Sequence, residues 1–417
     1  MSYGLMTKSA APATPAANKV EYYVDTADRR MKTLDDNGVI STLPNDGLQD
    51  RNILTNGNFA IQQKVATAAT DIVGISTTTR GGVVADCWSV TASSAAAGGK
   101  WAQIDTAGAQ DTGLQSRYYG SMVLSATARK MMLSQWILGS EMAHLRGKKV
   151  RVSVKINQKV GTGNTIKLGL LQLNVSGTVD TSPAFLSGAW SASTGVDPAW
   201  GTNLAAITPD ASPTGENGTI TGSYLNITTV ATTWTRSSCV FTVPTNAKNL
   251  VVVLFHDATG GATDNVSVAE FQMTEGPDIV DFVAPPLAEE VARCQRRYCK
   301  SFPLTTVPAA AIAEATAGPI YGTQVIAGSG TALGCVVFVQ FPRQMWKTPT
   351  VTLFTPVGAG ATIYRLTGTT PAVQGAAAQR GLSDRGLCVT ATNEATANGA
   401  VGNIVGVHYV ADAEIVA

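Results

Sequence analysis

Charged side chains are scarce in this sequence. Lys, Arg, Asp and Glu make up 14% of the 417 residues, against about 25% in ordinary globular proteins. The formal net charge is +1, so the chain has no field of one sign that would gather nucleic acid or an anionic membrane. We therefore expect no nucleic-acid partner. A surface with so little charge suits a protein held in an assembly or stabilised by wide sheet packing.

Metal-binding patterns are also missing. The three histidines, His144, His256 and His408, lie far apart, and no two cysteines form a C-x-x-C pair. A metal centre needs clustered ligands, so we expect no metal and no cofactor. We interpret the six cysteines as small buried apolar side chains. They are Cys87, Cys239, Cys294, Cys299, Cys335 and Cys388.

Long apolar runs are absent. The longest, Leu250–Phe255, is far shorter than the roughly 20 residues that a membrane-spanning helix needs. Met1–Lys19 contains no apolar segment typical of a secretory signal. We therefore expect a protein made in a cytoplasm and not inserted in a membrane.

No catalytic motif is complete. Gly328-Ser329-Gly330 resembles a nucleophile elbow but has Ala327 where a glycine is needed. Glycoside hydrolysis needs two facing carboxylates, whereas Asp35/Asp36 and Glu289/Glu290 are explained by a turn and by a helix start. We expect no enzyme and name no catalytic residue.

Short alternating segments dominate residues 51–284. Period-2 patterning bounded by Gly, Asn, Asp and Pro is typical of half-buried strands, and many such strands predict an antiparallel sandwich. The clearest segments are Lys149–Asn157, Ile166–Val175, Thr235–Val243 and Leu250–His256. Within this region, Arg129–Leu145 carries Met132, Trp136 and Ile137 at helical spacing, which predicts a short helix covering one end of the sandwich.

Residues 1–50 form an extended arm in this interpretation. Ser9–Lys19 is an Ala/Pro linker. Val20–Val24, Arg30–Leu34 and Val39–Leu43 read as short strands, and the Asp35–Gly38 turn favours a hairpin. A hairpin this small must lie against a neighbour.

A helix is predicted over 285–302. Pro286 suits its first turn, and its acidic start and basic second half suit the helix dipole. Leu287, Val291, Cys294 and Tyr298 form one apolar stripe. This stripe can pack on a sheet or on copies of itself in a trimer.

Residues 303–417 predict a C-terminal β-sandwich module. Gly334–Phe341, Thr350–Phe354, Leu387–Thr392 and Asn403–Val410 read as strands, whereas Pro371–Gln379 and Asn393–Ala400 read as loops. The fold class is thus mainly β: a jelly-roll sandwich, a connecting helix and a C-terminal β-module, preceded by the arm.

The segment Val179–Gly222 is a long Gly-, Ser-, Thr- and Pro-rich insertion that contains Trp190 and Trp200. A loop this long is usually functional or disordered. The two indole rings could form a platform for a sugar. Alternatively, they pin the loop to its own sheet or to a neighbouring subunit, which is the favoured alternative because large aromatic residues are mostly packing anchors.

Several motifs, taken in order, resemble proteins of bacteriophage tail fibres and appendages. The segment Asn18–Val24 followed by Met31–Val39 resembles their N-terminal segment. Asn52-Ile-Leu-Thr-Asn-Gly-Asn-Phe59 with Ala85-Asp86-Cys87-Trp88, and later Glu270-Phe-Gln-Met-Thr-Glu-Gly276, resemble the ends of a carbohydrate-binding-module-like jelly roll. Leu287-Ala-Glu-Glu with Arg293–Tyr298 resembles the helix that follows it, and Phe341-Pro with Lys347–Leu353 resembles terminal fibre modules.

The resemblance implies a structural virion protein, a homotrimeric tail fibre or receptor-binding appendage that attaches the particle to host surface polysaccharide. Its N-terminal arm, with Val20, Tyr22, Tyr23 and Val24, would dock on other virion proteins. The alternatives are a head fibre or capsid decoration protein and, without support from any residue, a glycan depolymerase. Jelly rolls of this kind also suggest a structural Ca²⁺ near Asn56, Asn58 and Glu270, but one carboxylate is few for this ion.

Overall fold

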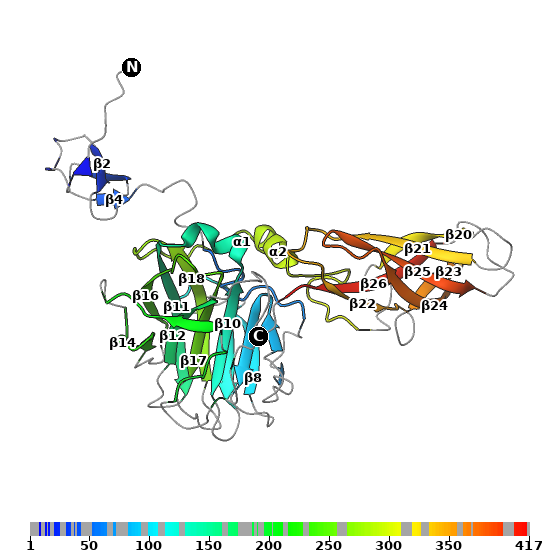
Figure 1. The fold of residues 1–417 in the computed structure, drawn as a ribbon, viewed down its shortest axis with the longest axis horizontal. Helices are drawn as coiled ribbons and strands as arrows, with labels where there is room; N and C mark the ends of the chain where they lie inside the picture. The colour runs from blue at the N-terminus through cyan, green and yellow to red at the C-terminus, as the bar shows by residue number, and fades with distance from the viewer. Residues whose placement is uncertain are drawn as a thin grey trace, which may run out of the picture.

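The computed structural model shows a chain built almost wholly from antiparallel β-sheet (Figure 1). It describes residues 8–9, 13–14, 16, 21–25, 31–34, 37, 40–42, 52–64, 70–71, 82–92, 99–106, 113–124, 130–160, 166–173, 186, 190, 196–201, 203–211, 216–227, 233–256, 265–309, 319–326, 333–356, 362–367, 370–394 and 404–414.

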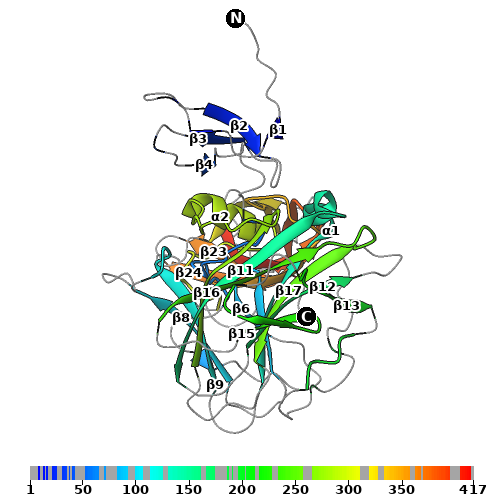
Figure 2. The same cartoon turned by 90° about the vertical axis from the view of Figure 1, so that its left-hand side faces the viewer.

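The N-terminal region contains a small four-stranded sheet. Its strands, in spatial order, are β1 (Lys8–Ser9), β2 (Glu21–Asp25), β3 (Met31–Leu34) and β4 (Ile40–Thr42). The last three match the strands predicted from the sequence to within about one residue at most ends. The parallel pairing of β1 with β2 was not predicted. Figure 2 shows this sheet beyond the end of the sandwich that carries both helices.

Two facing sheets form the central sandwich. The eight-stranded sheet runs in the order β14 (Thr219–Thr221), β15 (Tyr224–Ile227), β12 (Ile166–Leu173), β17 (Asn249–His256), β10 (Met131–Ile137), β7 (Trp88–Ala92) and β6 (Gly82–Ala85), with β13 (Leu204–Ile207) also paired to β12. The six-stranded sheet runs β16 (Thr235–Thr242), β11 (Lys149–Val160), β18 (Asn265–Glu275), β9 (Tyr118–Leu124), β8 (Gly99–Asp105) and β5 (Thr70–Asp71). The predicted antiparallel sandwich is confirmed.

Aromatic side chains fill the core between the two sheets. Trp88 is fully buried and lies with its ring centroid 5.2 Å from Phe59 and 4.9 Å from Phe271. Trp101 packs on Phe59 at 5.3 Å. A Cβ at Gly120 would come within 2.1 Å of the Trp101 ring, so this position on β9 admits only glycine.

Strand β10 corrects part of one prediction, because the short helix expected within Arg129–Leu145 begins only at Gly139. Residues 131–137 form a strand, and only the short helices α1 (Gly139–Met142) and η1 (Ala143–Leu145) follow it. Leu133 faces the core between the sheets, whereas Met132 and Trp136 lie in a second apolar cluster on the outer face. Because both faces are buried, apolar side chains occur on both and do not alternate along the strand, so Met132, Trp136 and Ile137 also fit the spacing of a helix.

The predicted connecting helix over 285–302 is shorter in the structure. Helix α2 spans Leu287–Gln295, and Tyr298–Lys300 form strand β19. The chain leaves the helix because β19 pairs with the last strand of the C-terminal sheet. Among the described residues, neither helix is long and apolar enough to cross a membrane.

The C-terminal sheet closes on itself. Its strands are β19, β20 (Ile320–Ile326), β21 (Leu333–Gln340), β22 (Thr350–Phe354), β23 (Thr362–Thr367), β24 (Thr370–Arg380), β25 (Gly386–Glu394) and β26 (Ile404–Asp412). Strand β26 pairs with both β20 and β23, which joins the two ends of the order β26-β20-β21-β25-β24-β23. The loop predicted for Pro371–Gln379 was wrong. These small residues lie in β24 because ladders to β23 and β25 hold them on both sides.

Candidate functional site

Part of the 179–222 insertion, expected as a loop, forms strands β13 and β14 of the eight-stranded sheet, and its two tryptophans lie in the apolar cluster on the outer face of that sheet. Trp190 is only 3% exposed, and its ring centroid lies 5.8 Å from that of Phe255 on β17. Trp200 is half-buried at 6.3 Å from the same ring, and its Nε1 donates a 2.8 Å hydrogen bond to the Tyr224 hydroxyl. The geometry therefore favours the packing alternative over an open sugar platform at these two rings.

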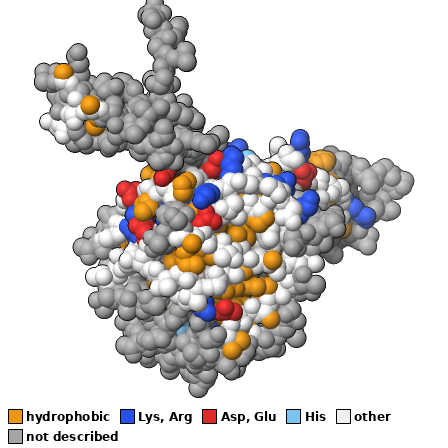
Figure 3. Space-filling view, turned by 60° about the vertical axis from the view of Figure 1, so that its left-hand side comes forward, with side chains coloured by type: hydrophobic (Ala, Val, Ile, Leu, Met, Phe, Trp, Pro, Cys, Tyr) orange, Lys and Arg blue, Asp and Glu red, His pale blue; other side chains and the backbone are white. Residues whose placement is uncertain are grey.

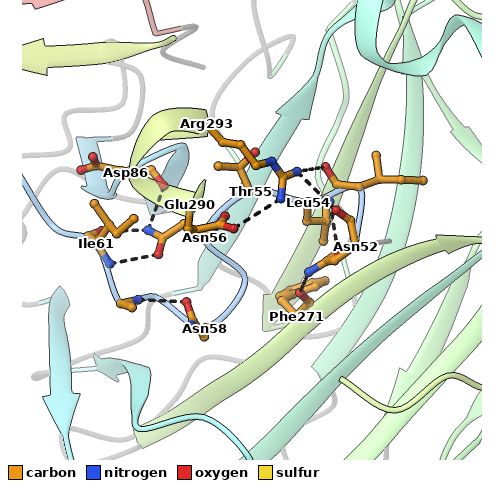
Figure 4. A network of polar contacts seen from close by, with 12 residues as sticks. Asn52, Leu54, Thr55, Asn56, Asn58, Ile61, Asp86, Phe271, Glu290 and Arg293 are labelled. Atoms are coloured by element: carbon orange, nitrogen blue, oxygen red, sulfur yellow. Dashed lines mark hydrogen bonds and ion pairs between the residues drawn. The ribbon is translucent and has the colours of Figure 1, made fainter. Parts of the chain in front are cut away.

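The Asn52 side chain ties the start of the sandwich to its last strand (Figure 4). Its Nδ2 donates to the Phe271 carbonyl at 3.0 Å, and its Oδ1 accepts from the backbone N–H groups of Leu54 and Met273, each at 3.0 Å. Every polar atom of this buried amide thus has a partner. The Asn-rich turn that resembles jelly-roll proteins closes the fold.

Asn56 closes the same turn towards helix α2. Its side chain bonds both backbone groups of Ile61 and the Asp86 carbonyl, and its backbone N–H donates to the Glu290 carboxylate. Arg293 extends from the same helix to the backbone carbonyl of Ile53 at 2.9 Å. Figure 4 shows these groups converging between the turn and the helix.

The residues that the resemblance suggested for Ca²⁺ are engaged separately. Glu270 pairs with Lys155 at 2.8 Å and accepts from the Ser116 N–H at 3.0 Å. Asn58 accepts from a neighbouring backbone N–H, and Asn56 is occupied as described above. Within the described part of the chain, no three His, Cys, Asp or Glu side chains gather as metal ligands.

A buried charge cluster joins the sandwich to the C-terminal sheet. Lys64 pairs with Asp412 at 2.8 Å and with Glu414 at 2.9 Å, and Glu414 also accepts from the Cys87 N–H. Burial alone would lower the pKa of Lys64, but the two carboxylates raise it. Burial raises the pKa of Asp86 to about 7, and the nearby Glu414 carboxylate adds to the rise.

Arg297 strengthens this junction from the end of α2. Its guanidinium donates to the Trp136 carbonyl at 2.9 Å and pairs with Glu141 at 2.8 Å. Burial would lower the pKa of Arg297, but Glu141 raises it. Lys300 donates to the Gln63 carbonyl at 3.0 Å. The helix and β19 therefore belong to a packed joint rather than to a linker.

A small polar pocket lies on the outer face of the six-stranded sheet. Its volume is about 20 Å³, enough for about one water molecule. Arg236 pairs there with Glu216 and Asp281, each at 3.1 Å, and Phe282 lies buried beside them. The charged groups of this pocket already pair with one another, and its volume is too small for an oligosaccharide. Figure 3 shows a largely uncharged face of the sandwich, with charged side chains gathered near the end next to the N-terminal sheet.

A larger groove opens on the outer face of the C-terminal sheet. Val337 and Val339 on β21 face its core, so Phe338 points outward and is 78% exposed. The space beside it measures about 480 Å³ and is wide open to solvent, so the groove is a shallow part of the surface rather than an enclosed pocket. It is lined by Phe338, Val339, Gln340, Gly381, Ser383, Arg385, Gly386, Leu387 and Cys388. The groove offers an accessible aromatic face together with amide and guanidinium groups.

The sequence contained part of the signal for this groove. Alternation over 334–341 predicts that residues 337 and 339 share one face and that Phe338 lies on the other. Whether that face is covered depends on segments distant in sequence, as the insertion over β17 shows. Arg385 and Cys388 come from the β24–β25 turn and from β25, which sequence reasoning did not bring to Phe338.

The predicted apolar stripe of the helix is mostly covered by its own chain. Leu287 is 57% exposed and Val291 is half-buried. Cys294 is fully buried in a cluster with Ile61 and Cys87. Tyr298 is also buried, but on β19. Only the first two positions remain accessible to another subunit.

The proposed anchoring residues fall in the N-terminal sheet. Tyr22, Tyr23 and Val24 lie on β2 and pair with β3, whereas Val20 is outside the described residues.

No family of protein sequences matches the chain, and no curated protein is detectably similar to it. Distant likenesses exist among solved structures. The module TmCBM61, solved in complex with β-1,4-galactotriose, is 13% identical, with a TM-score of 0.27, 54% of this chain covered and 99% of that one. The CBM22-1 xylan-binding domain of Paenibacillus barcinonensis Xyn10C is 10% identical, with a TM-score of 0.25 and coverages of 52% and 100%. The enzymatically active domain of bacteriophage CBA120 tailspike protein 4 is 11% identical, with a TM-score of 0.28, and the match covers 54% of this chain but 21% of that one.

Proposed function

We propose that this chain is a structural protein of a bacteriophage virion that attaches the particle to host surface glycan without cleaving it. The proposal joins the sequence resemblance to phage fibre proteins with a fold that is a small N-terminal sheet, a sandwich and a closed C-terminal sheet. A tail fibre or receptor-binding appendage uses these three parts as an anchor, a body and a contact surface.

The observation that carries the binding role is the groove at Phe338. A phenyl ring exposed to 78% beside a space of about 480 Å³ can stack on the apolar face of a sugar ring. Gln340 and Arg385 supply hydrogen-bonding groups around the ring, whereas the Ser383 hydroxyl is bonded within its own turn. An apolar platform with a few polar groups is the usual composition of a small-ligand site.

The packed junction supports attachment as one rigid body. Lys64, Arg297 and Lys300 bind the sandwich to the C-terminal region through buried ion pairs and hydrogen bonds. A homotrimer would present three such grooves in fixed positions, so that weak single sites would add up to firm attachment. Leu287 and Val291 on α2 would contribute to such a trimer.

The test is binding of the purified whole chain to host cells, compared with a Phe338→Ala variant. We expect the parent to bind and the variant to lose at least about tenfold in affinity, since aromatic contacts at the centre of a site dominate binding. Val283→Ala is the matched control, because Val283 is an apolar side chain that is 77% exposed and does not line the groove.

Absence of binding by the parent would refute the receptor role and favour a head fibre or capsid decoration protein. Incubation of host polysaccharide with the protein should leave the polymer length unchanged. Shortened chains would instead identify a depolymerase.

A further inference from the structure

Two arginines lie at or near the groove of Phe338, and neither forms an ion pair with another residue that the structure describes. Phe338 lies opposite Cys388 on β25, and Cys388 lies opposite Arg380 on β24. Directly opposed residues share one face of a sheet, so the guanidinium of Arg380 lies on the same outer face as the phenyl ring. Arg385 lines the groove itself.

Asp384, the acidic neighbour of Arg385, is joined to it only through the neutral Gln344 side chain. Asp384 accepts a 2.6 Å hydrogen bond from the Gln344 side chain, and Arg385 makes only a 3.5 Å contact to the same amide. Among the described residues, neither Arg380 nor Arg385 forms an ion pair. The groove is therefore an apolar platform flanked by two available cations.

We propose that this groove binds an acidic polysaccharide, with a sugar ring stacked on Phe338 and carboxylates held by Arg385 and Arg380. The inference rests on the proposed glycan-binding function and narrows it to anionic polymers. A guanidinium pairs with a carboxylate through two parallel hydrogen bonds, which adds orientation to charge. A neutral glycan would leave both cations unused.

The spacing of the row favours a polymer over a single sugar. Neighbouring strands lie about 4.8 Å apart, so the row from β21 across β25 to β24 spans about 10 Å. A chain of sugars crossing these strands would meet the phenyl ring first and a guanidinium further along. Charges on such an open surface are screened by salt, so binding must weaken as ionic strength rises.

Cys388 provides a direct probe of occupancy. It is half-buried and lines the groove, whereas Cys87, Cys239, Cys294 and Cys299 are buried. The rate of Cys388 alkylation by N-ethylmaleimide, read by peptide mass spectrometry on the native whole chain, reports whether the groove is covered. The probes are polygalacturonate, alginate and hyaluronate, with dextran as the neutral polymer.

We expect at least one acidic polymer to slow alkylation of Cys388 by about tenfold at low salt, with the protection lost near 1 M NaCl. Phe338→Ala and Arg385→Gln should each abolish most of this protection, while Arg385→Lys keeps part of it. Arg343→Gln is the matched control, since Arg343 is an exposed arginine that does not line the groove.

Three results would overturn the inference: no protection by any acidic polymer, equal protection by dextran, or unchanged protection of the Arg385→Gln variant. A fall in oligomer mass of Phe338→Ala in analytical ultracentrifugation would also overturn it, by assigning the patch to contacts between copies of this chain.

The outcomes separate this inference from the proposed function. Host cells that bind the parent and Arg385→Gln equally would refute the acidic site and leave attachment standing. Protection by acidic polymers without any binding to host cells would support the site and refute attachment to that host.

Discussion

Asp86 is a carboxylate placed where its charge is costly. It is fully buried, and its side chain is held by the backbone and side-chain amides of Gln63. Its pKa is raised to about 7 from an ordinary value of 3.8, first by burial and then by the Glu414 carboxylate. In the unfolded chain the same group ionises near its ordinary value, so the folded state retains one extra proton between roughly pH 4 and pH 7.

This linkage gives the first prediction. Because the folded state binds more protons in that window, the contribution of Asp86 to the free energy of unfolding falls as pH rises from 4 to 7. Asp86→Asn removes this titration. From pH 4 to pH 7 the free energy of unfolding of the variant should therefore rise relative to that of the parent by up to about 4 kcal/mol. Urea unfolding of both proteins at each pH measures the difference between their free energies of unfolding. The contributions of other titrating groups, such as His408, cancel in this difference. A constant difference between the two proteins would contradict it.

At the scale of elements, alternation located the strands with one buried face or clear boundaries. The predicted strands 149–157 and 350–354 lie in β11 and β22, and the predicted strand 235–243 extends one residue beyond β16. Strand β10 was missed because its two faces meet two different apolar clusters. Strand β24 was missed because its Ala- and Gly-containing sequence has little β-strand propensity. It is held as a strand by its pairing with the neighbouring strands.

The insertion over the eight-stranded sheet gives the second prediction. Trp190→Ala removes a ring that is 3% exposed against Phe255, and loss of a buried Trp costs about 3–5 kcal/mol. We expect a large fall in unfolding free energy, while host-cell binding of the remaining folded protein is unchanged. Trp190→Phe is the milder control. Loss of binding without loss of stability would restore the sugar-platform interpretation.

The same limits of sequence reasoning apply to the candidate site. The outward direction of Phe338 follows from local alternation, but its exposure does not. Phe255 on β17 also points away from the inter-sheet core, yet Trp190, Trp200 and Tyr224 cover it. Contacts between segments distant in the sequence decide whether an outward-facing aromatic side chain is covered. A single sequence does not reveal these contacts.

At the scale of the whole molecule, the sandwich and the C-terminal sheet unfold together if their junction is as strong as its contacts suggest. Lys64→Met leaves the carboxylates of Asp412 and Glu414 without their cation, beside Asp86. Breaking a buried ion pair costs about 3–5 kcal/mol, and we expect somewhat less because Asp412 is 34% exposed.

Scanning calorimetry tests this third prediction. The parent should show one main transition, and Lys64→Met should split it or lower its midpoint. Lys148→Met is the matched control, since the Lys148–Glu275 pair lies at the surface and such pairs contribute about 1 kcal/mol or less. Equal effects of the two variants would show that the junction is not held by its charges.

The N-terminal sheet gives the last prediction. Its strands pair with one another, and in the described residues they pair with no strand of the sandwich or the C-terminal sheet. Three or more strands need an apolar face or a packing partner to be stable, and Leu34 of this sheet is buried within the chain. The proposed anchoring role would place a virion protein against this sheet. A chain that begins at Asp50 should therefore keep the oligomer mass, unfolding free energy and groove of the parent, because the two cores lie wholly beyond residue 50.

The shortened chain should fail to join particles assembled in its presence, as measured by the protein content of purified virions. Incorporation of the shortened chain at the parent's level would refute anchoring by residues 1–50 and move the attachment surface to the sandwich or the C-terminal sheet.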